Sequence, residues 1–142
     1  MTMRVLFAGG DTGFLELEQR FLSHCGHNAM IAHDGLECAS ALRDFIPDVV
    51  VIDCELLWGG SEGVIALMLE DPRLSQTPVI LIADDDPRET YEDMMEWMTV
   101  GWIRKPYGMS ELLTQLTSHV QLCRLPSAGY VVPKLTAFQG TE

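Results

Sequence analysis

The stretch Pro47-Asp48-Val49-Val50-Val51-Ile52-Asp53 constrains the fold of this chain more than any other. Four consecutive aliphatic residues lie between two aspartates. A continuous apolar run of this kind is typical of a strand buried on both faces, as in the middle of a parallel sheet. Asp53 stands at the carboxyl end of the run, where ligands and chemistry gather in open α/β sheets. Asp53 is therefore the first candidate site residue.

The remainder of the chain alternates between short apolar runs and segments with apolar residues at helical spacing. The runs predict strands over residues 4–8, 28–32, 47–53, 78–83 and 102–104, and the spacing predicts helices over residues 14–26, 36–45, 63–70, 88–98 and 110–124. Because parallel strands need a crossover helix between them, we expect an α/β fold with a doubly wound, five-stranded parallel sheet and helices on both faces. Residues 1–124 form one domain in this interpretation, and residues 125–142 form a C-terminal tail in which residues 130–132 could add a small strand.

Composition narrows the classes of function. The chain has 142 residues and a formal net charge of −12, which argues against binding to nucleic acid or to an anionic membrane surface. No apolar run approaches the roughly 20 residues of a membrane span, and no signal peptide is expected. Four scattered cysteines without CxxC spacing indicate reduced thiols in the cytoplasm. The four histidines are expected to be solvated or to cap helices.

The predicted topology brings several strand ends to one edge of the sheet. That edge would collect the following residues: Gly9, Gly10, Asp11, Asp53, Ala83, Asp84, Asp85, Asp86 and Lys105. A carboxylate near a lysine ammonium, with further acids close by, can bind a hard cation together with an anionic group.

With these landmarks in order, the chain resembles the receiver domain of two-component response regulators, of which the chemotaxis response regulator is the single-domain example. The resemblance covers about residues 3–124. It is carried by Pro47 to Asp53, Asp71-Pro72-Arg73, Pro78-Val79-Ile80-Leu81-Ile82, and Lys105-Pro106-Tyr107 ahead of Ser110-Glu111-Leu112-Leu113. It implies a flavodoxin-like sheet with the strand order 2-1-3-4-5, and a role in signalling rather than as an enzyme.

The resemblance also implies roles for individual positions. Asp53 matches the aspartate that accepts a phosphoryl group from a histidine kinase or phosphotransfer protein, and Lys105 matches the lysine that contacts the phosphoryl oxygens. A carboxylate pair after the first strand would hold magnesium. A hydroxyl at the end of the fourth strand, where Ala83 stands, and an aromatic on the fifth, where Trp102 stands, would form the switch.

The sequence departs from this pattern at the positions that would bind the metal and at one position of the switch. Gly9 and Gly10 replace the expected acidic pair, and Ala83 has no hydroxyl. Magnesium needs only one or two protein carboxylates, so Asp11 and Glu55, together with Asp53, are the acids that could still hold it. Asp84, directly after Ala83, is a further candidate. A proline often seen four residues beyond the acceptor is replaced by Leu57.

Three functions therefore stay open. In the first, Asp53 accepts a phosphoryl group in a phosphorelay, and output passes to a downstream protein partner. In the second, the chain is a pseudo-receiver whose face over residues 88–124 binds a partner, or a second copy as a homodimer, without phosphorylation. In the third, the glycine-rich loop over residues 9–13 binds a nucleotide or flavin, although it matches neither the Rossmann fingerprint nor the P-loop. If the 142 residues are the whole protein, output must pass through docking.

Overall fold

The structure is a computed structural model that describes residues 2–56, 60–93 and 98–123. Five strands form one sheet: β1 (Arg4–Ala8), β2 (Asn28–Ala32), β3 (Val49–Asp53), β4 (Val79–Ala83) and β5 (Val100–Arg104). All neighbouring strands pair in parallel, in the order β2-β1-β3-β4-β5. The predicted sheet and its strand order are therefore confirmed, and β3 lies at the centre of the sheet.

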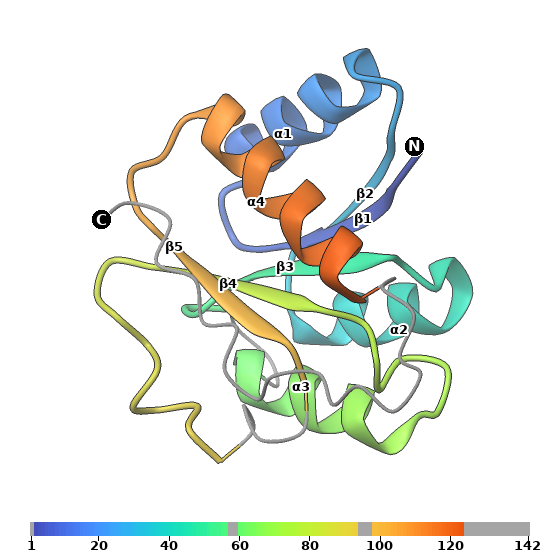
Figure 1. Cartoon of the computed structure of the whole chain (residues 1–142), viewed down its shortest axis with the longest axis vertical. Coiled ribbons are helices and arrows are strands. Elements are labelled where there is room, and N and C mark those ends of the chain that lie inside the picture. Colours follow the sequence, from blue (N-terminus) through green and yellow to red (C-terminus); the bar gives the residue numbers. More distant parts are fainter. Residues whose placement is uncertain (1, 57–59, 94–97, 124–142) are drawn as a thin grey trace.

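Helices cover both faces of the sheet (Figure 1). They are α1 (Thr12–His24), α2 (Gly35–Phe45), α3 (Gly60–Glu70) and α4 (Met109–Cys123). In Figure 1, α1 and α4 lie on one side of the sheet and α2 and α3 on the other. None of these four helices has the length and apolar character that crossing a bilayer requires.

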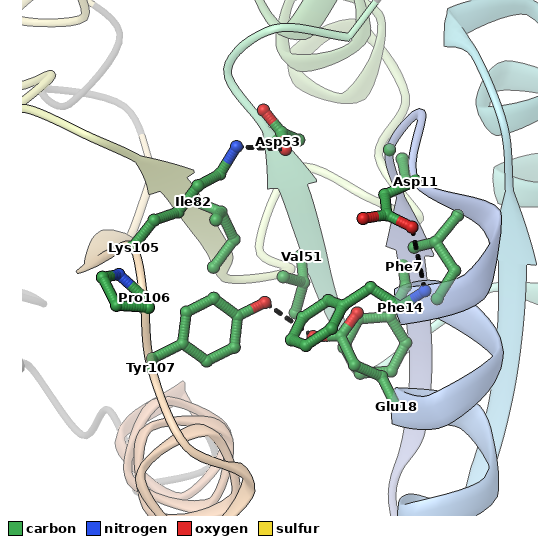
Figure 2. A pocket seen from close by; sticks show the side chains of 13 residues that line it. Phe7, Asp11, Phe14, Glu18, Val51, Asp53, Ile82, Lys105, Pro106 and Tyr107 are labelled. Atoms are coloured by element: carbon green, nitrogen blue, oxygen red, sulfur yellow. Dashed lines mark hydrogen bonds and ion pairs between the residues drawn. The ribbon is translucent and has the colours of Figure 1, made fainter.

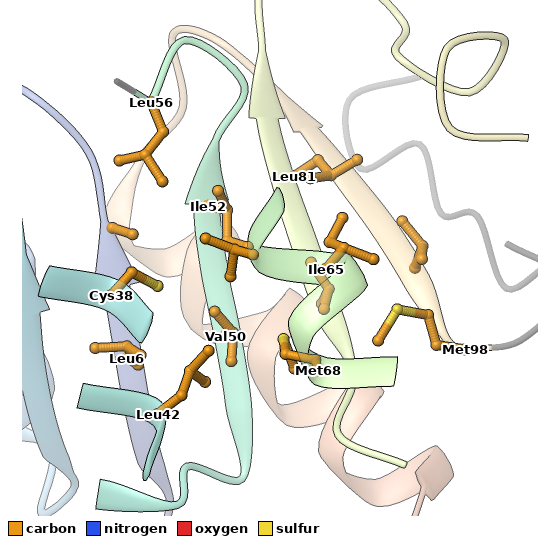
Figure 3. Packing of buried hydrophobic residues seen from close by; sticks show 14 of the residues in the cluster. Leu6, Cys38, Leu42, Val50, Ile52, Leu56, Ile65, Met68, Leu81 and Met98 are labelled. Atoms are coloured by element: carbon orange, nitrogen blue, oxygen red, sulfur yellow. The ribbon is translucent and has the colours of Figure 1, made fainter. Parts of the chain in front are cut away.

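Two hydrophobic cores result from the alternation of side chains along the strands. Val50 and Ile52 of β3 face α2 and α3, where they pack with Leu42, Ile65 and Met68 (Figure 3). Val49 and Val51 face the other way and join the core under α1 and α4. The four aliphatic residues of β3 are each at most 3% exposed. The prediction that this apolar run forms a strand buried on both faces is therefore confirmed.

The predicted helix over residues 88–98 is wrong in its described part, because residues 88–93 form turns. The Asp86 carboxylate accepts hydrogen bonds from the backbone N–H of Arg88, at 2.9 Å, and from its guanidinium. Such local bonding competes with a helix. The acids Glu89, Glu92 and Asp93 also stand at helical spacings where like charges repel. Residues 94–97 lie outside the described residues.

Other predicted boundaries shift by a few residues. Helix α1 begins at Thr12 because the carboxylate of Asp11 accepts a hydrogen bond from the backbone N–H of Phe14 and caps the helix. Strand β5 extends two residues further toward the N-terminus than predicted, since it pairs with β4 from Val100 onward. Leu57 and the predicted tail, including residues 130–132, lie outside the described residues.

Candidate functional site

The carboxyl ends of β1, β3, β4 and β5 meet at one edge of the sheet, because all the strands are parallel. This edge carries Gly9 and Gly10 after β1, Asp53 at the end of β3, Ala83 at the end of β4 and Lys105 after β5. The structure therefore brings together the strand ends that the sequence predicted to form the site.

Asp53 and Lys105 form an ion pair, with 2.7 Å between the Nζ of Lys105 and the Oδ2 of Asp53 (Figure 2). The other oxygen of Asp53, Oδ1, accepts a hydrogen bond of 2.8 Å from the backbone N–H of Glu55. The Lys105 and Asp53 side chains are 29% and 24% exposed. Partial burial lowers the pKa of Lys105, but the hydrogen bond and the charge of Asp53 outweigh this and raise the pKa overall.

Of the two glycines after β1, only Gly9 lies next to the Asp53 side chain. A Cβ atom at position 9 would lie 3.5 Å from the Cβ of Asp53, which is an ordinary van der Waals contact. A Cβ atom at position 10 would have nothing within 4 Å. A side chain at position 9 would therefore stand beside Asp53, and glycine contributes no carboxylate there.

The acids that could replace the missing pair lie around the ion pair of Asp53 and Lys105: Asp11 lines the same pocket as Asp53, and the charges of Glu55 and Asp84 act on Lys105. Asp11 uses its Oδ1 to cap α1, at 3.1 Å from the backbone nitrogen of Phe14. Glu55 and Asp84 are exposed. Among the described residues, no three His, Cys, Asp or Glu side chains are placed to hold a metal ion. Magnesium needs only one or two protein carboxylates and keeps several waters, so binding of magnesium by Asp53 with Asp11 or Glu55 stays a prediction.

The two predicted switch positions have different surroundings. Ala83 is half-buried, and its carbonyl accepts a hydrogen bond of 2.9 Å from the backbone N–H of Lys105. Trp102 is 3% exposed and packs in the core with Tyr91 and Met98. The guanidinium of Arg104 lies 4.9 Å from the centre of the Trp102 ring. Trp102 is therefore a core residue, and a switching role for either position stays a prediction.

A pocket of about 260 Å³ extends from Asp53 and Lys105 toward α1 (Figure 2). Its inner part holds Glu18, which is only 2% exposed and accepts a hydrogen bond of 2.7 Å from the Tyr107 hydroxyl. The pKa of Glu18 is raised to about 7: burial raises it most, the Tyr107 hydrogen bond offsets part of this, and the charges of Asp53 and Asp11 raise it further.

The sequence did not indicate Glu18 as a site residue, and Tyr107 was named only as part of the Lys105-Pro106-Tyr107 landmark. A signal was available, since Glu18 lies three residues after Leu15 and four before Leu22, on the buried stripe of α1. An acid on such a stripe must find a partner or a cavity.

The loop over residues 9–13 leads into a helix start that is already capped by a carboxylate. The backbone N–H of Gly9 is bonded to the carbonyl of Ala32. Those of Phe14 and Leu15 are bonded to the carboxylate and carbonyl of Asp11. The Asp11 carboxylate therefore sits at the helix N-terminus, where the third interpretation would place a phosphate.

Comparison with known proteins agrees with this architecture. No family model matches the chain. Two curated relatives, both response regulator MprA, come from Mycobacterium ulcerans (22% identical over 128 residues) and Mycobacterium bovis (23% identical over 119 residues). The alignments cover 88% and 82% of this chain but 53% and 50% of the relatives. The chain thus spans about half the length of these curated relatives.

Solved structures share the whole fold. The chemotaxis response regulator CheY4 of Vibrio cholerae has a TM-score of 0.75 at 18% identity, covering 84% of this chain and 99% of that one. The receiver domain of the sensor histidine kinase PA1611 of Pseudomonas aeruginosa, solved with magnesium in its active site cleft, has a TM-score of 0.72 at 15% identity, covering 85% and 99%. The chain therefore has the fold of response regulator receiver domains, as its motifs predicted.

Proposed function

We propose that this chain is a receiver-type signalling domain that acts by contact with a protein partner and does not depend on magnesium-assisted phosphoryl transfer to Asp53. Position 9 carries this proposal. A side chain there would face Asp53 with 3.5 Å between the two Cβ atoms, so a carboxylate at this position would stand beside Asp53. Glycine supplies none.

The electrostatics of the pocket support the same conclusion. Phosphoryl transfer is catalysed by cations that neutralise the charge of the transferring group. An incoming phosphoryl group would meet the carboxylates of Asp53 and Asp11, with Lys105 as the one cation that lines the described pocket. Lys105 already forms an ion pair with Asp53. At Ala83 there is also no hydroxyl to read out a phosphoryl group.

The partner surface in this proposal is the face over residues 88–124, of which β5, α4 and the turns at 88–93 are described. Exposed positions of α4 carry small or uncharged polar side chains: Ser110, Thr114, Ser118 and Gln121. A polar surface of this kind suits a reversible contact, either with a downstream protein or with a second copy of the chain. Free cysteines suit a cytoplasmic location.

One observation favours a second candidate, in which Asp53 is a phosphoacceptor for a histidine kinase or phosphotransfer protein. The Lys105 ammonium is already 2.7 Å from Asp53. It is therefore placed to contact a phosphoryl group on that carboxylate. In this version the domain is a self-modifying signal acceptor and still not a turnover enzyme.

Intact-mass spectrometry separates the two candidates. The wild type and an Asp53→Asn control are incubated with acetyl phosphate, with and without magnesium. We expect neither protein to gain the mass of a phosphoryl group. A gain in the magnesium-treated wild type that is absent from Asp53→Asn would overturn the first proposal and establish the phosphoacceptor.

A further inference from the structure

The pocket beside Asp53 continues inward between the sheet and α1, and the resemblance to receiver domains assigns no role to this inner part. Apolar side chains from three strands and α1 form its walls: Phe7, Phe14, Leu15, Val51 and Ile82. Pockets for drug-sized ligands measure roughly 300–1,000 Å³, so a volume of about 260 Å³ suits a molecule with a single ring or a short branched chain.

Glu18 gives the apolar pocket an ionisable inner end. Its side chain lines the cavity although the residue is 2% exposed. Tyr107 is the one hydrogen-bond partner recorded for Glu18 among the described residues, and it engages only Oε2. Figure 2 shows the Tyr107 hydroxyl directed at Glu18, with the Phe14 ring beside them. The rings of Phe14 and Tyr107 meet edge to face, with centroids 5.6 Å apart.

The charged groups around the pocket favour a positively charged ligand over a negatively charged one. Lys105 is paired with Asp53 at the mouth, and Asp11 caps α1. The carboxylate of Glu18 is left without a cation, in an environment where burying a lone charge is costly. An anion would meet the carboxylates of Asp53 and Asp11 and would oppose ionisation of Glu18, whereas an ammonium group would stabilise the ionised form of Glu18 and could lie against the aromatic rings.

We propose that this pocket binds a small primary amine with a compact aromatic or branched aliphatic body, with its ammonium group on Glu18 and its body against Phe14 and Tyr107. The inference goes beyond the function proposed above and holds whether or not Asp53 is phosphorylated. Because Tyr107 follows Lys105 by two residues, an occupant of the pocket contacts the same turn that holds the ion pair with Asp53. Binding of the amine would thus be a signal that reaches the Asp53–Lys105 pair without phosphorylation.

Calorimetric titration of the full 142-residue chain tests the proposal. The probes are benzylamine and its neutral counterpart benzyl alcohol, at about pH 8, above the pKa of Glu18. We expect benzylamine to bind about tenfold or more tightly than benzyl alcohol, because it adds a charge-assisted hydrogen bond. Glu18→Gln, which keeps an acceptor for Tyr107, should remove that preference. Glu16→Gln, an exposed change on the same helix, should leave it intact.

A second measurement uses only the wild type and does not depend on how a variant folds. At about pH 6, where Glu18 is largely protonated, benzylamine binding should release up to about one proton, detected by titration in buffers of different ionisation enthalpy. At about pH 8 the release should vanish. Asp11, Asp53, Lys105 and Tyr107 also face the pocket, so the change must disappear in Glu18→Gln. Equal binding of both probes, no saturable benzylamine binding, or an unaltered affinity in Glu18→Gln would each overturn the proposal.

Discussion

The ammonium of Lys105 reaches past the end of β4 and lies 2.7 Å from the Oδ2 of Asp53 at the end of β3. Neighbouring strands are about 4.8 Å apart and β4 lies between β3 and β5, so the side chains of Lys105 and Asp53 together span two strand spacings. Their path crosses the end of β4, where Ala83 has only a methyl group. The ion pair therefore connects the end of β3 with the end of β5 across β4.

The Lys105–Asp53 pair should contribute measurably to stability. We expect Lys105→Met to lower the free energy of unfolding by about 1 kcal/mol, since the pair is partly buried but still open to solvent. In a double-mutant cycle with Asp53→Asn, the coupling energy should be about 0.5–1 kcal/mol. Urea denaturation of the four proteins gives this value, and a coupling near zero would show that the pair is not formed in solution.

Aspartates at positions 9 and 10 should create a magnesium site. Both positions have room for a Cβ atom, and the one at position 9 would face Asp53. We expect magnesium to raise the melting temperature of a Gly9→Asp, Gly10→Asp variant and to leave that of the wild type unchanged. At a magnesium concentration tenfold above Kd the gain in stability is about 1.4 kcal/mol.

The control for this site adds Asp53→Asn to the double variant. Without magnesium, the double variant should be less stable than the wild type, because its carboxylates repel one another. The triple variant should lose most of the response to magnesium. If the double variant does not respond to magnesium, the three carboxylates do not form a metal site at this edge of the sheet. The two glycines would then not be the only difference between this chain and a receiver domain that binds metal.

Burial of Glu18 should make the protein less stable as pH rises. The pKa of Glu18 is raised from 4.5 to about 7 in the folded state, so the folded protein keeps a proton that the unfolded chain has released between these values. Stability from this group is therefore present below about pH 4.5 and is lost as pH rises through about 7, with a total of about 3 kcal/mol.

Comparison with Glu18→Gln isolates this effect from the other charges of the pocket, namely Asp11, Asp53, Lys105 and Tyr107. The variant should gain stability relative to the wild type between about pH 5 and pH 8, as measured by urea denaturation across that range. If the difference between the two proteins does not change with pH, Glu18 is not buried as the structure describes.

Much of the fold could be predicted because its strands are short apolar runs that end at aspartates, glycines or a Lys-Pro pair. The bounds of β1 and β2 agree with the sequence-based prediction. The helix expected over residues 88–98 failed in its described part, because periodicity reports on burial and not on competition from Asp86 for the backbone of Arg88. Hydrophobic spacing alone cannot detect such local bonding.

The candidate site was half predictable. Asp53 and Lys105 could be placed together because parallel strands bring their carboxyl ends to one edge. Glu18 escaped notice, since acids on an amphipathic helix are usually solvated and only its position on the stripe with Leu15 and Leu22 indicates otherwise. The expectation that all four histidines are solvated or cap helices was wrong for His119, which is 2% exposed between α4 and the sheet.

His119 explains why β5 contains a glycine, and this gives a last prediction. A Cβ atom at position 101 would lie 2.3 Å from the Nε2 of His119 and 2.7 Å from its Cε1. The Nδ1 of the same ring is 2.8 Å from the carbonyl oxygen of Gln115, so the ring is held against the strand. We expect Gly101→Ala to lower the free energy of unfolding by about 2–3 kcal/mol through overpacking.

A double-mutant cycle tests whether His119 is the cause. In a His119→Ala background, which removes the ring, Gly101→Ala should cost less than about 1 kcal/mol, because glycine is itself unfavourable in a strand. Gly63→Ala, in α3 with nothing within 4 Å of its Cβ position, is the matched control and should stabilise by up to about 1 kcal/mol. An equal cost of Gly101→Ala in both backgrounds would mean that the backbone of β5, rather than the imidazole ring, requires glycine.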